Sequence, residues 1–247
     1  MAQLNSTTKW GIGIVVVILG LVVGGPYVYI HFIEGDAPAP LSLSTSNNTS
    51  TTTIATSGTD ENAPSTTAGS SSGGVVDGTW KPTDSSQVGY RVKEVLFGQS
   101  ATAVGRTNKV TGTMTINGST LSTAEFTVDM TSVASDKSQR DNQFKGRIMD
   151  TDNFPTATFT LSAPVDFGSV PQEGATITAK ATGKLTLKGT TKDVTLDLEA
   201  DRKGNDIEVN GTFDIVFADW KIDNPSFGPA QTEDKGSLEF LLVLSRS

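Results

Sequence analysis

The chain has 247 residues, no cysteine, a single histidine and a formal net charge of -8 at pH 7. The lack of cysteine excludes disulfides, thiolate metal sites, thiol catalysis and a lipid anchor on cysteine. Because His31 is the only histidine, the rest of the chain cannot supply a Ser-His-Asp relay or a histidine-rich zinc site. The acidic composition also argues against nucleic acid as a partner, since phosphate contacts need a basic surface.

An uncharged, apolar run begins at Trp10 and extends to Ile30. Its length matches the roughly 20 residues that a helix needs to cross a bilayer. We therefore expect residues 10–33 to form one transmembrane anchor. A cleavable signal peptide is the alternative, but the apolar part of such a peptide normally has only about 7 to 15 residues.

Charges on the two sides of this run predict its orientation. Lys9 precedes it, whereas Glu34 and Asp36 follow it. The positive-inside tendency then places a short N-terminus, residues 1–9, in the cytoplasm and the rest of the chain outside.

Residues 34–74 consist mostly of Ser, Thr, Asn, Ala, Gly and Pro. Such a segment has too few large apolar side chains to offset the entropy that ordering would cost. The sequence therefore predicts a disordered linker here and leaves residues 75–247 to fold as one domain of ordinary size.

Apolar and polar residues alternate along most of residues 75–247, which predicts an all-β domain of about eight antiparallel strands with one apolar face each. The alternating segments are residues 88–92, 110–116, 124–130, 157–163, 177–187, 194–198, 207–217 and 238–244. Strands of this kind can close into a barrel or form a two-sheet sandwich.

Helical spacing interrupts this pattern once, between residues 138 and 150. Phe144 and Ile148 are four residues apart and would share one face of a short helix. Phe154 and Pro155 then end the helix before the alternation returns. We favour the barrel over the sandwich because an inserted helix with one apolar face can cover a barrel mouth.

Three runs in this domain resemble the YceI-like family of polyisoprenoid-binding proteins. They are Gln139-Arg-Asp-Asn-Gln-Phe144 through Phe154-Pro-Thr-Ala-Thr-Phe-Thr160, Gly183-Lys-Leu-Thr-Leu-Lys-Gly-Thr-Thr-Lys-Asp-Val-Thr-Leu196, and Asp219-Trp-Lys-Ile through Phe227-Gly-Pro-Ala230. Their order and spacing agree with the family over nearly the whole region from Trp80 to Leu244.

The resemblance implies an extended lipocalin-like antiparallel barrel with one inserted helix. It further implies a non-enzymatic protein without cofactor or metal, which holds a long isoprenoid such as a quinone or prenyl phosphate in its lumen. The family is typically exported to the bacterial cell envelope. Together with the predicted anchor, this places the domain at the outer face of the bacterial cytoplasmic membrane, and no oligomeric state is predicted.

The sequence departs from the family pattern at two positions that bear on the ligand head group. Glu94 and Gln143 stand where the family often has histidine, whereas Arg140 and Asp141 match. We therefore expect either a different head group or one that is held by Arg140, Arg91 or Lys93. The alternative for Arg140 is a structural ion pair near the helix, with Asp141, Asp136 or Asp150 as its partner.

The apolar rows of the strands and the apolar face of the helix are the expected lining of the lumen. The predicted lining residues are Tyr90, Phe126, Val128, Phe144, Ile148, Phe154, Phe159, Leu161, Leu185, Phe213 and Trp220. The same rows would fit a filled core. In that case the domain would be a tethered, non-catalytic β interaction domain that binds protein or cell-wall polymer. Catalytic residues are not predicted, since no carboxylate has a base, metal motif or nucleotide loop beside it.

Overall fold

The computed structural model describes residues 37–44, 76–228 and 230–247. Within these ranges no helix is long and apolar enough to cross a bilayer. The predicted N-terminus, residues 1–9, and the predicted anchor, residues 10–33, lie outside the described part of the chain.

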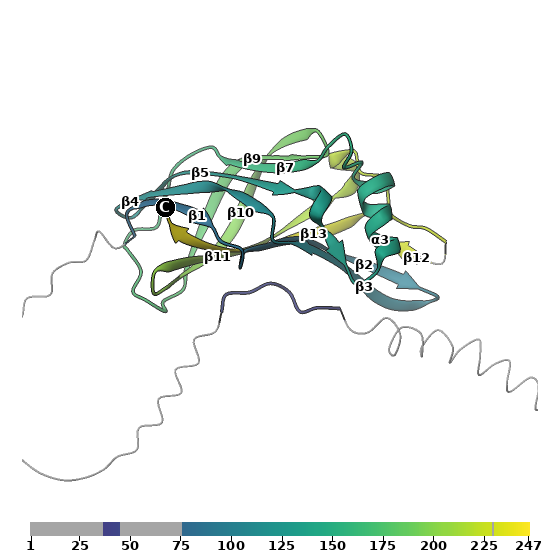
Figure 1. Ribbon diagram of the computed structural model, residues 1–247, viewed down its shortest axis with the longest axis horizontal. Helices are drawn as coiled ribbons and strands as arrows, with labels where there is room; N and C mark the ends of the chain where they lie inside the picture. The colour runs from purple at the N-terminus through teal and green to yellow at the C-terminus, as the bar shows by residue number, and fades with distance from the viewer. Residues whose placement is uncertain (1–36, 45–75, 229) are drawn as a thin grey trace, which may run out of the picture.

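The described strands close into an antiparallel barrel (Figure 1). The hydrogen-bonded path runs β1-β4-β5-β7-β9-β10-β11-β13 and returns from β13 to β1. These strands are β1 (Gly78–Pro82), β4 (Val110–Asn117), β5 (Thr120–Asp129), β7 (Thr156–Leu161), β9 (Ile177–Leu187), β10 (Thr190–Lys203), β11 (Asp206–Val216) and β13 (Lys235–Arg246). The predicted all-β barrel of about eight strands is thus confirmed.

Two further long strands, β2 (Gln87–Leu96) and β3 (Gln99–Thr107), extend the wall at one end of the barrel. β2 follows β1 after a turn and pairs with the first half of β13, and β3 pairs with β2. The alternation in the sequence predicted neither the short strand β1 nor β3. In β3, small residues such as Ala103 and Gly105 occupy the inward row opposite Val92 and Tyr90. Small side chains give no visible apolar period.

The helix predicted between residues 138 and 150 is present beside β3, at the same end of the barrel (Figure 1). It consists of α3 (Ser138–Gln143) and the π-helical turn η4 (Phe144–Ile148). In this turn the Met149 amide donates to the Phe144 carbonyl at 2.8 Å. The remaining short elements are η3 (Met130–Ser132), β6 (Ala134–Ser135), β8 (Val165–Asp166), η5 (Phe217–Trp220) and β12 (Ala230–Thr232).

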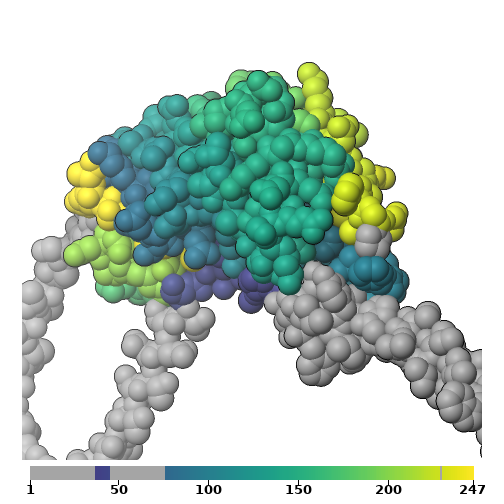
Figure 2. All heavy atoms as spheres, turned by 45° about the vertical axis from the view of Figure 1, so that its right-hand side comes forward, coloured from purple at the N-terminus to yellow at the C-terminus, as the bar shows by residue number. Residues whose placement is uncertain are grey.

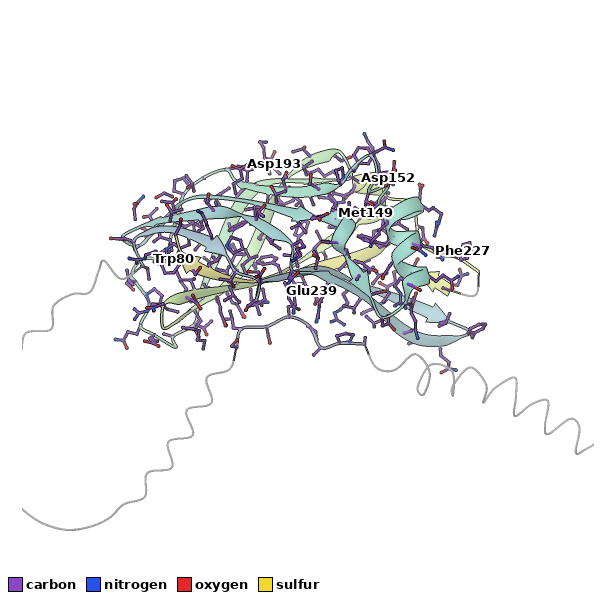
Figure 3. All side chains as sticks on the ribbon, in the orientation of Figure 1. Trp80, Met149, Asp152, Asp193, Phe227 and Glu239 are labelled. Carbon is purple, nitrogen blue, oxygen red and sulfur yellow. The ribbon has the colours of Figure 1, made fainter. Side chains whose placement is uncertain are left out.

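The apolar side chains form two clusters, one at each end of the barrel. The first includes Phe144, Met149 and Phe217 near the helix. The second includes Trp80 and Leu244 at the opposite end. Figure 3 shows Met149 close to the helix and Trp80 far from it.

Residues 37–44, which we call the strap, lie along the outer face of the sheet formed by β11, β13 and β2 (Figures 1 and 2). The predicted disordered linker, residues 34–74, is therefore wrong for these eight residues. The remaining residues of that linker lie outside the described ranges. Composition predicted disorder because residues 34–74 as a whole have few large apolar side chains, but the backbone groups of the strap find partners on the barrel.

The partners of the strap are charged and amide side chains that point outward from the sheet. Arg91 and Arg106 donate to the carbonyls of Pro38 and Ala39. Both arginines also pair with Glu239, which is only 2% exposed. The sheet thus carries a buried ion network that binds the backbone of an extended segment.

The other end of the strap is held by a second buried carboxylate. The amide and the hydroxyl of Ser44 donate to Glu208 at 2.8 and 2.7 Å. Between the two carboxylates, Asn210 donates to the Leu41 carbonyl at 3.0 Å. Because Glu208 is 6% exposed, these hydrogen bonds replace water that the carboxylate has lost.

We expect Ser44→Ala to loosen the strap. The substitution removes a hydrogen bond to a buried charge, of about 1.5 kcal/mol, which corresponds to about tenfold faster amide exchange. Hydrogen exchange at the backbone amides of positions 41 and 44 would measure this, with Ser42→Ala, at an exposed position, as the control. Unchanged exchange at both amides would show that the strap does not depend on Glu208.

Candidate ligand-binding site

A cavity of about 830 Å3 runs through the barrel and is lined by side chains of both apolar clusters. The inward rows of the strands form its wall, so the face that would be the core of a filled barrel is also the face of the lumen. At the helix end the lining includes a few charged side chains, and at the opposite end it includes Asp201 and Arg202, whereas the wall between the two ends is mostly apolar.

Aromatic side chains leave this lumen open because their rings lie over glycines of the neighbouring strand. A Cβ atom built on Gly105 would come within 2.4 Å of the Tyr90 ring, and one on Gly211 within 2.5 Å of the Phe240 ring. The glycines therefore let these rings rest against the wall instead of filling the axis. Four pairs share this arrangement: Tyr90 with Gly105, Phe126 with Gly112, Phe159 with Gly183, and Phe240 with Gly211.

All but two of the predicted lining residues lie on the cavity wall. Those on the wall are Tyr90, Phe126, Val128, Phe144, Ile148, Phe159, Leu161, Leu185 and Phe213. They come from different strands and from the helical turn η4, which the closed path of strands brings together. The apolar face predicted for the helix, Phe144 and Ile148, indeed covers this end of the lumen.

Phe154 and Trp220 were predicted to line the lumen and do not. Phe154 instead packs over the turn between β9 and β10, where a Cβ on Gly189 would meet its ring at 2.5 Å. Trp220 is 3% exposed and packs in the first apolar cluster, with the Lys192 ammonium 5.7 Å from its ring centroid. Neither residue lies in a strand, since Phe154 lies between η4 and β7 and Trp220 belongs to the short helix η5, so strand alternation does not predict the direction of their side chains.

Arg91 was predicted to reach a ligand head group, and this too is wrong. Its side chain lies on the outer face of β2, where it pairs with Glu239 at 3.4 Å and binds the strap. The alternation of a strand already excludes a shared face for Tyr90 and Arg91, because neighbouring residues point to opposite sides.

Arg140, the second predicted head-group residue, lies on the cavity lining at the helix end. Its guanidinium pairs with Asp136, which lies just before α3, and with Glu94 on β2, the latter at 3.4 Å. The structural ion pair considered as the alternative therefore exists with Asp136. Asp141 instead accepts hydrogen bonds from the amide and hydroxyl of Ser135, both at 2.7 Å.

Glu94 is a lining residue that the predicted set omitted. Its side chain is 9% exposed, and it shares the inward row of β2 with Tyr90 and Val92. The same alternation that places Tyr90 on the lumen could have identified it. The charge on Arg140 offsets the cost of burying this carboxylate.

Tyr90 completes the polar group at this end of the lumen. Its ring stacks on Phe144 with a centroid distance of 5.0 Å and an interplanar angle of 14°. Burial raises the pKa of the Tyr90 phenol above its usual range, and the positive charge of Arg140 opposes only part of this shift. The phenol is therefore a neutral hydrogen-bonding group at physiological pH.

Further wall residues come from the second half of the barrel and from β4. They are Met114, Leu196, Leu198, Val209, Phe240 and Leu242. Each belongs to an alternating row that the sequence already showed, but without the strand order the sequence did not indicate which rows border the open space.

A family comparison fits this architecture. The model of the YceI-like domain matches residues 80–244. The chain belongs to the YceI-like family. A search of curated proteins finds no match.

Solved structures with a similar fold include a polyisoprenoid binding domain from Saccharophagus degradans. It is 16% identical, with a TM-score of 0.54, and the match covers 68% of this chain and 98% of that one. BcnA from Burkholderia cenocepacia is 22% identical, with a TM-score of 0.48 and coverage of 62% and 95%. The YceI protein of Campylobacter jejuni is 17% identical, with a TM-score of 0.44 and coverage of 58% and 84%.

Within the described residues of this YceI-like barrel, no group of three or more His, Cys, Asp and Glu side chains is placed to hold a metal ion. The polar group at the helix end includes Tyr90, Glu94 and Arg140, which can donate and accept hydrogen bonds at the edge of an apolar lumen. Asp136, Lys137, Gln139 and Gln143 also belong to the lining at this end.

We expect Gly211→Ala to push the Phe240 ring toward the lumen axis, because the new methyl would occupy its place. Overpacking of this kind costs about 1 to 3 kcal/mol of unfolding free energy and would reduce uptake of an apolar fluorescent dye. Denaturant unfolding and dye titration measure the two effects. Gly146→Ala is the control, since nothing lies within 4 Å of its added Cβ; equal behaviour of the two variants would contradict the role of the glycine.

We also expect the stability of the barrel to fall above about pH 10, where a tyrosine in the unfolded chain ionises. The folded barrel keeps the Tyr90 phenol protonated because its pKa is raised, so the native state binds more protons than the unfolded state in this range. Stability is therefore fully present below about pH 10 and is lost as the pH rises.

Tyr90→Phe should remove this part of the alkaline loss while it keeps the stacked ring. Unfolding free energies of both proteins between about pH 8 and pH 11 test the expectation. Identical pH profiles would show that the phenol is not held neutral.

Proposed function

We propose that this YceI-like barrel binds the apolar chain of an isoprenoid lipid in its lumen and carries or sequesters it outside the cytoplasm. The observation that carries the proposal is the cavity of about 830 Å3, whose long wall is apolar and whose helix end carries a group of polar side chains. An amphiphile with a long apolar tail and a compact polar head matches this arrangement of apolar wall and polar end. The similar structure from Saccharophagus degradans is itself described as a polyisoprenoid binding domain.

The size and lining of the cavity suit such a tail energetically. Its volume falls within the range of about 300 to 1,000 Å3 typical of ligand pockets. Each CH2 group that leaves water contributes about 0.8 kcal/mol, so a few isoprene units bind tightly without strong polar contacts. Aromatic walls held back by glycines leave room for branched chains of this kind.

The polar end of the lumen favours an uncharged head group, such as a quinone, over a prenyl phosphate. Arg140 already neutralises Glu94 and Asp136, so it has little positive charge to offer a second anion. A phosphate there would meet the buried carboxylate of Glu94 at close range, which costs free energy. A quinone carbonyl needs only a hydrogen-bond donor, which Arg140 or the Tyr90 phenol supplies.

For location, we propose the outer face of the bacterial cytoplasmic membrane, with the N-terminus inside. The support is the uncharged run predicted as an anchor, residues 10–33, and the charges on its two sides. The barrel would then remain beside the membrane that contains its ligand.

The other function considered from sequence was an interaction domain with a filled core. It requires the inward rows to pack against one another, and the cavity is at odds with that requirement. We therefore do not favour it.

A binding competition tests the proposal. The delipidated full chain would be titrated with a quinone and a prenyl phosphate of equal chain length. We expect the quinone to bind at least about tenfold more tightly, a difference of about 1.4 kcal/mol. Tighter binding of the phosphate would contradict the uncharged head group, and binding of neither would contradict lipid carriage altogether.

Phe159→Trp separates a lumen from a packed core. The larger ring should lower lipid occupancy about tenfold, whereas the unfolding free energy falls by less than about 1.5 kcal/mol because the ring has open space to enter. Val216→Trp is the control, since Val216 is 49% exposed and lies off the cavity wall. Equal losses of occupancy and stability in Phe159→Trp would indicate a filled core.

A further inference from the structure

Large apolar side chains are exposed around the helix end of the cavity. Val95, Phe97 and Phe227 are 43%, 52% and 56% exposed, and we call these three residues the rim. Phe97 lies at the tip of the β2–β3 hairpin. Phe227 bridges to Ala230 of β12, which pairs with Leu96 next to this tip. Figure 3 shows Phe227 at the end of the barrel that is opposite to Trp80.

The rim marks the place where the lumen meets the surface. Phe97 and Phe227 belong to the cavity lining and are nevertheless more than half exposed. Exposed aromatic side chains around the opening of an apolar lumen are typical of a surface that contacts another molecule or a membrane. An apolar partner at this position would join the lumen to an apolar phase.

Two cationic side chains, Arg147 and Lys93, lie next to the rim, together with the exposed Glu233, whose amide donates to the Lys93 carbonyl. The Arg147 guanidinium is 5.9 Å from the Phe227 ring centroid and donates to the Pro225 carbonyl at 2.9 Å, which holds it there. Lys93 is exposed on the same face of β2 as Val95. Aromatic rings with adjacent cations match the interface of a bilayer, where rings lie at the level of the head groups and cations meet lipid phosphates.

The N-terminal end of the strap points toward the rim. Its contacts begin at Arg91 and end at Glu208, so its N-terminal end points along β2 toward the hairpin tip. From Arg91 the strand continues for about 20 Å to Phe97. The docked strap therefore starts on the side of the barrel that carries the rim.

Chain length then limits how far the rim can lie from the predicted anchor. Only four peptide units separate residue 33, the predicted end of the anchor, from Ala37 at the start of the strap. An extended chain of this length spans at most about 14 Å. An anchor attached so closely keeps the rim end of the barrel within reach of the bilayer.

We propose that the rim is a membrane-contacting surface, which inserts into the outer leaflet of the bilayer that holds the anchor. The strap sets this orientation, and the lumen opens directly onto lipid, so that a ligand moves between bilayer and barrel without crossing water. This inference rests on the proposed lipid carriage but adds a partner and a surface to it.

The absence of cysteine allows a direct test in the full chain. Ser100→Cys places one thiol at an exposed position next to the rim, and Asn205→Cys places one at the exposed β10–β11 turn at the other end. Each is labelled with an environment-sensitive dye, and the full chain is reconstituted into nanodiscs with a quencher on the lipid head groups. We expect several-fold stronger quenching at position 100 than at position 205.

The rim itself is tested by Phe97→Asp combined with Phe227→Asp. These changes should abolish the difference in quenching and slow the transfer of lipid from the bilayer. Asn205→Asp adds the same type of charge at the far end and should change neither measurement. Phe97→Leu with Phe227→Leu keeps the rim apolar and should preserve the difference in quenching.

Lipid content, measured by mass spectrometry of the same samples, separates this inference from the proposed function. Equal or no quenching at the two positions would overturn the rim as a membrane surface, even if the protein carries lipid. Strong quenching at position 100 in a protein that never contains lipid would overturn lipid carriage and support the contact. Quenching that persists in the Phe97→Asp and Phe227→Asp protein would also contradict the role of the rim.

Discussion

The structure depends on a single-layer wall whose inward row must close the barrel without filling it. Aromatic rings would normally occupy the axis of such a barrel, but Tyr90 and Phe240 lie over Gly105 and Gly211 on the neighbouring strands. The rings therefore stabilise the wall by covering backbone, and the axis stays open over about 830 Å3. The apolar capacity proposed for lipid follows directly from this packing.

On the outer face of the barrel, the cost of burying carboxylates is offset by their ion-pair and hydrogen-bond partners. Burying Glu239 and Glu208 would cost several kcal/mol each without partners. Arginines and the strap supply these partners. The strap therefore binds to the outer face of the barrel through the same carboxylates that it covers from water. The barrel thus has an apolar inner face suited to a ligand and a charged outer face that fixes the direction of its N-terminal segment.

Much of this architecture could be predicted from the sequence because strand alternation determines which side chains share a face. The rows and most lining residues follow from it, whereas the inserted helix follows from the four-residue spacing of Phe144 and Ile148. The positions of Phe154 and Trp220 could not be predicted from strand alternation, since these residues lie at or beyond the ends of regular elements. The small inward residues of β3 hid that strand, and the strap was missed because its order comes from distant side chains such as Glu239 rather than from its own composition.

The central claim is that the lumen holds a lipid. A native mass spectrum of the full chain, purified gently from its own membrane, tests it most directly. The account predicts a bound mass that matches an isoprenoid with an uncharged head group and that disappears on unfolding. A protein that is consistently empty, and that also rejects added prenyl lipids, would contradict it.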